Sequence, residues 1–217
     1  MKTVLQAWSI ALAGGLASLP AMGQATDVTF FDGGYAELCS VAAHNLNDMG
    51  KIVITGSRVD IPPLEICTLA IREGGTTGGG SLAASYTNRG VIQFAAGAVD
   101  AAMADFDAAL RLDDNMAQAH VNRGYILNGR EQWAEGIAAF DRGIALGVSA
   151  APATAPELAA VPGSVSEIAR AHYNRGIAHE ELGHAREAYL DYLRASELAP
   201  AWAQPQEELK RFTVTRR

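Results

Sequence analysis

The tripeptide Asn-Arg-Gly occurs three times, and the spacing of its copies constrains the fold more than any other feature of the sequence. The copies stand at 88–90, 122–124 and 174–176. The first two glycines are 34 residues apart, and the second and third are 52 apart, which is the same period plus an insertion of 18 residues. Self-similarity at a fixed period of this length is typical of stacked repeat proteins. We therefore expect an array of similar units.

A second segment follows each tripeptide at a constant offset, at 102–110, 136–144 and 188–196. Apolar residues recur in these segments three and four positions apart, which places them on one face of a helix. Each unit is thus predicted to be two amphipathic helices. Because 49% of the chain is hydrophobic but only 7% is aromatic, much of the packing must come from alanine and aliphatic side chains.

This pattern resembles the tetratricopeptide repeat, whose signature has a small residue at position 8, Ala at 20, an aromatic at 24, Ala at 27 and Pro at 32. Unit two is the least regular copy, and unit one departs at Asp114, where proline is expected. The matching residues are Gly90, Ala102, Phe106 and Ala109 in unit one, Gly124, Gly136, Phe140 and Gly143 in unit two, and Gly176, Ala188, Tyr192, Ala195 and Pro200 in unit three. The resemblance implies an all-α solenoid of antiparallel helix pairs, in which small residues let helix A and helix B of each unit approach closely.

The array is predicted to cover residues 83–200, and the flanking segments are more degenerate. Within 26–82, residues 34–43 and 62–73 are expected to form a degenerate first helix pair, with Pro63 in the first turn of its second helix. Residues 51–55, between these two helices, have β-propensity, so an extended connection is the alternative structure for that segment. Residues 74–80 are predicted to be a linker and 148–165 an exposed loop that could hold a short helix, while 201–217 should provide a capping helix and tail.

Residues 1–25 have the layout of a secretory signal peptide, with the basic Lys2, an apolar stretch over 4–19 and then small residues. An uncleaved membrane anchor is the alternative, but the stretch is short and holds two glycines. The protein is therefore predicted to be exported to a bacterial periplasm, with no membrane insertion after the signal is removed. Cys39 and Cys67, the only cysteines, are expected to form a disulfide there, with two buried free thiols as the alternative.

The first helices of stacked units line the inner surface of a superhelix, and such surfaces bind partners. Three asparagines at position 6 could hydrogen-bond the backbone of an extended peptide, or each could stabilise its own repeat instead. Tyr125 and Tyr173 could add apolar anchors. The residues predicted to line this groove are Thr87, Asn88, Val91, Gln118, Val121, Asn122, Tyr125, Arg170, Tyr173, Asn174 and Ile177.

Other functions are less well supported. The net charge of -7 argues against nucleic acid as a partner, because that binding depends on Lys and Arg. His179 and His184 look superficially like a zinc-protease element, but their spacing of five exceeds the four that one helical face requires, and Gly183 should end the helix. His120 and His172 are expected to be satisfied interhelical residues. Arg89, Arg123 and Arg175 are expected to pair with acids such as Asp107 or Asp141.

The sequence thus predicts a non-enzymatic protein–protein interaction or scaffold module with no cofactor and no metal, which binds a peptide or protein segment in its groove. A self-associating structural protein of the cell envelope is the alternative, and a small hydrolase on a helical scaffold is favoured less.

Overall fold

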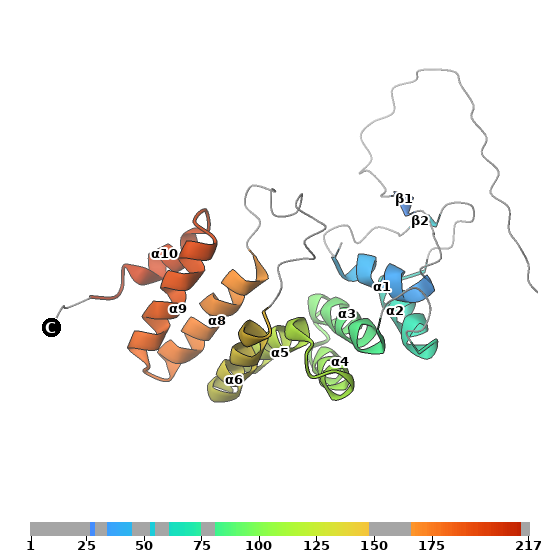
Figure 1. The fold of residues 1–217 in the computed structure, drawn as a ribbon, viewed down its shortest axis with the longest axis horizontal. Helices are drawn as coiled ribbons and strands as arrows, with labels where there is room; N and C mark the ends of the chain where they lie inside the picture. The colour runs from blue at the N-terminus through green and yellow to red at the C-terminus, as the bar shows by residue number, and fades with distance from the viewer. Residues whose placement is uncertain are drawn as a thin grey trace, which may run out of the picture.

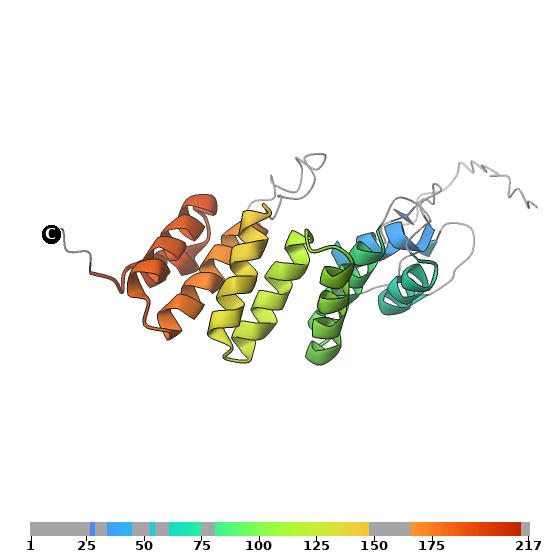
Figure 2. The ribbon, with the colours of Figure 1, turned by 60° about the horizontal axis from the view of Figure 1, so that its bottom comes forward.

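The computed structural model describes residues 27–28, 34–44, 53–54, 61–74, 81–147 and 166–213. Its helices follow one another in chain order along an elongated array, from α1 and α2 at one end to α10 at the other (Figure 1 and Figure 2). The helices are α1 (Gly34–His44), α2 (Pro63–Arg72), α3 (Leu82–Ala95), α4 (Val99–Leu112), α5 (Ala117–Gly129), α6 (Trp133–Ala145), α8 (Glu167–Glu181), α9 (Ala185–Leu198) and α10 (Ala203–Leu209). The predicted all-α solenoid is confirmed.

Two short strands add to this solenoid at its N-terminal end. Strand β1 (Asp27–Val28) pairs in parallel with β2 (Val53–Ile54), and β2 lies within the segment whose composition favours extended structure. The predicted signal peptide, the insertion at 148–165 with its possible short helix, and residues 75–80 of the linker lie outside the described residues.

A glycine–aromatic contact joins helix A to helix B in each of the three clear units. The aromatic ring is buried, and a β-carbon on the facing glycine would lie 2.6–2.8 Å from a ring carbon, so that any larger residue would force the ring or the helix to shift. The small residue at position 8 is therefore what lets the two helices meet, as predicted. The contacts are Gly90–Phe106, Gly124–Phe140 and Gly176–Tyr192.

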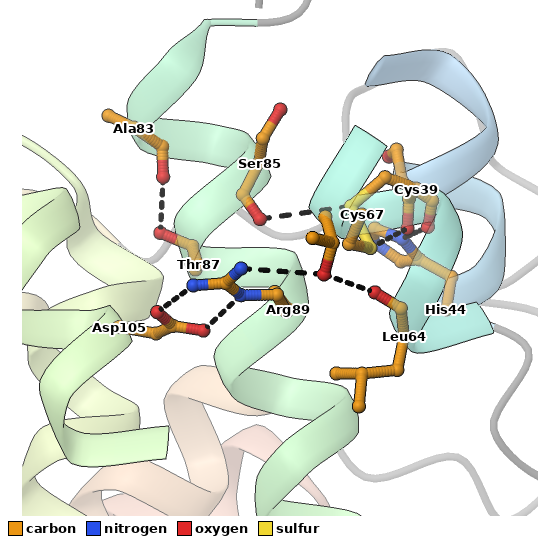
Figure 3. The surroundings of a disulfide bond; sticks show 11 residues. Cys39, His44, Leu64, Cys67, Ala83, Ser85, Thr87, Arg89 and Asp105 are labelled. Atoms are coloured by element: carbon orange, nitrogen blue, oxygen red, sulfur yellow. Dashed lines mark hydrogen bonds and ion pairs between the residues drawn. A yellow bond between two sulfur atoms is a disulfide. The ribbon is translucent and has the colours of Figure 1, made fainter. Parts of the chain in front are cut away.

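The first helix pair has two cysteines at this contact. Ala70 follows Cys67 by three residues, as Ala109 follows Phe106, so Cys67 takes the place of the aromatic residue. Cys39 of α1 faces it, with both residues fully buried, their Cα atoms 4.6 Å apart and their sulfur atoms within bonding distance (Figure 3). The cysteine pair therefore replaces the glycine–aromatic packing.

An arginine at position 7 of each clear unit reaches back to the preceding helix pair. Arg123 donates to Asp107 at 3.0 Å, and Arg175 donates to Asp141 at 2.6 Å. The predicted pairing of these arginines with acids is confirmed, and the structure assigns which arginine binds which aspartate. Arg89 pairs with an acid of its own unit, since it donates to both carboxylate oxygens of Asp105 at 2.7 Å (Figure 3). It also donates to Thr68 of α2 at 3.4 Å, which ties the first pair to the array.

The predicted interhelical histidines are also satisfied. His120 Nε2 lies 3.0 Å from the carbonyl oxygen of Asp114, and His172 Nδ1 donates to Asp191 at 2.8 Å. At the C-terminal end, α10 covers the last unit, and the ring of Trp202 lies 4.8 Å from that of Tyr173. Among the helices of the described residues, none combines the length and apolar character needed to cross a membrane.

Candidate functional site

The helix A surface, which we define as the faces of α3, α5 and α8 that hold the predicted groove residues, divides into a covered and an accessible part. In unit one, Thr87 is 1% exposed and Asn88 is 7% exposed, while Val91 packs against the core that α1 and α2 share with α3. In unit two, Val121 is fully buried against Phe140. These four predicted groove residues therefore contribute to packing, and the accessible part lies on α5 and α8.

The three asparagines at position 6 differ in their surroundings. Asn174 Nδ2 donates to the carbonyl of Arg170 in its own helix at 2.9 Å, which is the structural role that the sequence left open. Its own carbonyl accepts a hydrogen bond of 2.8 Å from Asn128, which joins α5 to α8. Asn122 Nδ2, in contrast, is buried without a hydrogen-bond partner. Asn122 is thus the asparagine with an unused donor.

Tyr125 presents a second unused polar group on the same helix. It follows Asn122 by three residues, so both side chains lie on one face of α5. Its hydroxyl is buried without a partner, and its ring packs edge-on against Phe140 with 5.4 Å between centroids. Burial raises the pKa of Tyr125 well above its ordinary value, and the nearby Glu167 raises it further while Arg170 opposes them. The phenol therefore stays protonated and can donate.

Glu167, in the first turn of α8, belongs to the same neighbourhood. Burial raises the pKa of its carboxyl group, and the charges of His44 and Arg170 partly offset this effect. His44 is the last residue of α1, so the C-terminal end of α1 lies near the beginning of α8. Neither Glu167 nor His44 was predicted as a site residue. Because an 18-residue insertion precedes α8, no periodicity in the sequence relates the two positions.

The remaining predicted residues border this neighbourhood. Arg170 is exposed, whereas Gln118 and Ile177 are half-buried. Tyr173 is also half-buried, since its ring lies 5.5 Å from that of Tyr192 and packs against the C-terminal cap. The structure therefore brings Tyr125 and Arg170 close to Glu167, with Asn122 on the same face of α5 as Tyr125. Tyr173 instead belongs to an aromatic cluster with Tyr192 and Trp202.

The chemistry that Asn122 and Tyr125 offer at this site is hydrogen-bond donation. Asn122 and Tyr125 offer two donors, and a buried donor without an acceptor costs about 1–3 kcal/mol. A ligand that brings carbonyl or carboxylate oxygens would remove that cost. Among the described residues there is no group of three or more His, Cys, Asp or Glu side chains that could hold a metal ion.

Comparison with known proteins identifies the repeats. The family model described as "Tetratricopeptide repeat" matches residues 83–116 and 169–201. No curated protein matches the sequence.

Solved structures share the fold. YrrB, described as a TPR protein with an unusual peptide-binding site, aligns with a TM-score of 0.54 and 20% identity over 67% of this chain and 63% of its own. MamA aligns with a TM-score of 0.52 and 15% identity over 68% of this chain and 73% of its own. A double mutant of MamA RS-1 aligns with a TM-score of 0.52 and 19% identity over 82% of this chain and 83% of its own. The chain thus carries tetratricopeptide repeats, with α5 and α6 forming a further helix pair of the same design between the two matched segments.

Proposed function

We propose that this protein is a non-enzymatic interaction module that binds an extended peptide or protein segment on the helix A surface between α5 and α8. The observation that carries the proposal is the pair of buried, unpartnered donors, Asn122 Nδ2 and the Tyr125 hydroxyl, three residues apart on one helical face. Most buried polar groups in proteins have partners, so two orphans side by side favour a site completed by a ligand.

An extended peptide offers the matching acceptors. Its backbone has one carbonyl per residue, and these carbonyls can accept from an amide and a phenol without regard to the peptide's sequence. Arg170 and Glu167, which lie near Tyr125, would then select among side chains of the peptide by charge. The likeness to YrrB, which is described as having an unusual peptide-binding site, is compatible with this function.

The binding proposal predicts different effects on affinity and on stability. A peptide selected from a displayed library against the protein should bind Tyr125→Phe and Asn122→Ala roughly three- to tenfold more weakly than wild type, because a hydrogen bond contributes about 0.5–1.5 kcal/mol. Thermal unfolding without peptide should show no loss of stability in either variant, because each substitution removes a donor that has no partner. Isothermal titration calorimetry and thermal melts measure the two quantities.

The control substitution is Tyr189→Phe, which removes a phenolic hydroxyl from helix α9 instead of α5. Its affinity for the selected peptide should equal that of wild type. If Tyr125→Phe bound the peptide as tightly as wild type, the site would have to lie elsewhere on the array.

We further propose that the chain is exported to the periplasm and that Cys39 and Cys67 form a disulfide there. The composition of residues 1–25 and the facing of the two buried sulfur atoms support this. Because this pair replaces the glycine–aromatic contact of the other units, the bond would hold α1 on α2 where no ring does so.

Intact mass spectrometry of the protein recovered from the cell envelope tests both statements. The mass should correspond to a chain that begins after Gly23 or Ala25, and alkylation should add two groups only after reduction. A full-length mass would exclude signal cleavage, and two alkylated thiols without reduction would exclude the disulfide.

A further inference from the structure

The turn between α8 and α9 brings together the two histidines that the sequence separates by five residues. Helix α8 ends at Glu181, and Gly183 adopts a left-handed conformation with φ of 76°. The amide of His184 then donates to the carbonyl of His179 at 2.8 Å, and that of Gly183 donates to Glu180 at 2.9 Å. This pair of bonds is a Schellman motif, which turns the two flanking side chains toward each other.

The two imidazoles face each other at a distance suited to a shared metal ion. Their Nδ1 atoms are 3.4 Å apart, and the pair is accessible to solvent. Two nitrogens at this separation, each about 2.0–2.1 Å from one ion, subtend an angle of about 110°, which is the tetrahedral angle that Zn²⁺ prefers. The backbone turn therefore brings together two imidazole nitrogens that, five residues apart, would not lie on one face of a helix.

The corresponding turns of units one and two have the same backbone but lack the ligands. In unit one, Gly97 has φ of 78°, and the amide of Ala98 donates to Gln93 at 2.9 Å. In unit two, the amide of Gln132 donates to Leu127 at 2.9 Å. The repeat thus supplies the turn three times, and only the third copy carries two imidazoles.

We propose that His179 and His184 bind one divalent transition-metal ion of the imidazole-preferring class, with Zn²⁺ as the ion that the geometry favours. Water completes the coordination, because the described residues contain no group of three potential ligands. The neighbouring Glu180 is already engaged by the Tyr192 hydroxyl and by Arg211. The site lies at the C-terminal end of α8 and in the turn that follows it, away from the proposed peptide site at the start of that helix (Figure 1).

Titration of the full chain, without a histidine tag, with ZnCl₂ tests the site. Isothermal titration calorimetry in a non-coordinating buffer should show one ion per chain, and His179→Ala or His184→Ala should each weaken binding by about tenfold or more. MgCl₂ should give no binding heat, since Mg²⁺ requires oxygen ligands. His44→Ala, which removes another exposed histidine, should bind Zn²⁺ like wild type.

A graft tests whether the turn is sufficient. The double variant Gln93→His with Ala98→His places two imidazoles on the equivalent turn of unit one, so it should bind two ions per chain. Circular dichroism shows that each variant remains folded. Equal Zn²⁺ affinity in wild type and His184→Ala would overturn the proposal, as would saturable binding of only one ion by the folded graft. In the first case, the facing imidazoles would simply share a hydrogen bond.

Discussion

Replacing Phe140 with alanine is expected to lower the free energy of unfolding by about 3–5 kcal/mol, the usual cost of removing a buried aromatic ring. Phe140 is fully buried and holds α6 on α5, in the middle of the array. Denaturant unfolding followed by circular dichroism measures the loss. Phe94→Ala is the matched control, because this phenylalanine is 39% exposed, and it should cost less than about 1 kcal/mol. Equal losses in the two variants would contradict the packing argument.

A double-mutant cycle isolates the glycine–aromatic contact itself. Gly124→Ala alone should destabilise the protein, because its β-carbon would lie 2.8 Å from a ring carbon of Phe140. Phe140→Ala removes that ring, so the double variant should lose less stability than the sum of the two single variants, by at least about 1 kcal/mol. Simple additivity would mean that the ring does not limit the approach of the two helices.

The fold could be predicted because the residues that set it recur in register. Gly124 and Phe140 are 16 residues apart, as are Gly90 and Phe106, so a single contact repeated along the chain determines how each pair closes. Because Cys39 and Cys67 are the only cysteines of the sequence, their side chains could be predicted to face each other. The structure adds that they occupy the glycine–aromatic positions, which could not be inferred because the first pair lacks the Asn-Arg-Gly tripeptide.

The candidate site was only partly predictable, since exposure depends on what packs over a residue. Position 5 holds Thr87 and Val121 in units one and two, and both are buried by neighbours that their own helix does not specify. Asn122 and Asn174 occupy the same position in the repeat, but only Asn174 finds an acceptor in its own helix. Glu167 reaches the site because of how α8 enters the array after the insertion. Helical periodicity carries no information on any of these contacts.

The geometry of the turn after α8 could not be predicted from helical periodicity either. Gly183 is predicted to end the helix, but the sequence does not indicate how the chain turns after it. Because Gly183 is left-handed, His179 and His184, five residues apart, have their Nδ1 atoms 3.4 Å from each other. In unit two, Glu131 adopts the same conformation with φ of 60°, so the turn forms even without glycine.

Asp191→Asn is expected to lower the free energy of unfolding at neutral pH by roughly 3 kcal/mol, because it removes one partner from a buried ion pair. Asp191 is 4% exposed and accepts hydrogen bonds of 2.6–2.8 Å from Arg175 and His172. Asp141→Asn is the matched control, since this aspartate binds the same Arg175 from the surface with a side chain that is 56% exposed, and it should cost less than about 1 kcal/mol. Urea unfolding at pH 7 compares the three proteins.

The ion pair of Asp191 and Arg175 also predicts how the free energy of unfolding depends on pH. Burial alone would raise the pKa of Asp191, but the hydrogen bonds from Arg175 and His172 outweigh it and hold the pKa below its ordinary value. A carboxyl group whose pKa is lower in the folded state stabilises the protein above its unfolded pKa of about 3.9, and this contribution is lost as the pH falls through the folded pKa. The stability difference between wild type and Asp191→Asn should therefore shrink as the pH is lowered from 7 to about 3. A difference that stays constant over this range would show that the charge of Asp191 is not what stabilises the pair, because an asparagine at this position does not titrate.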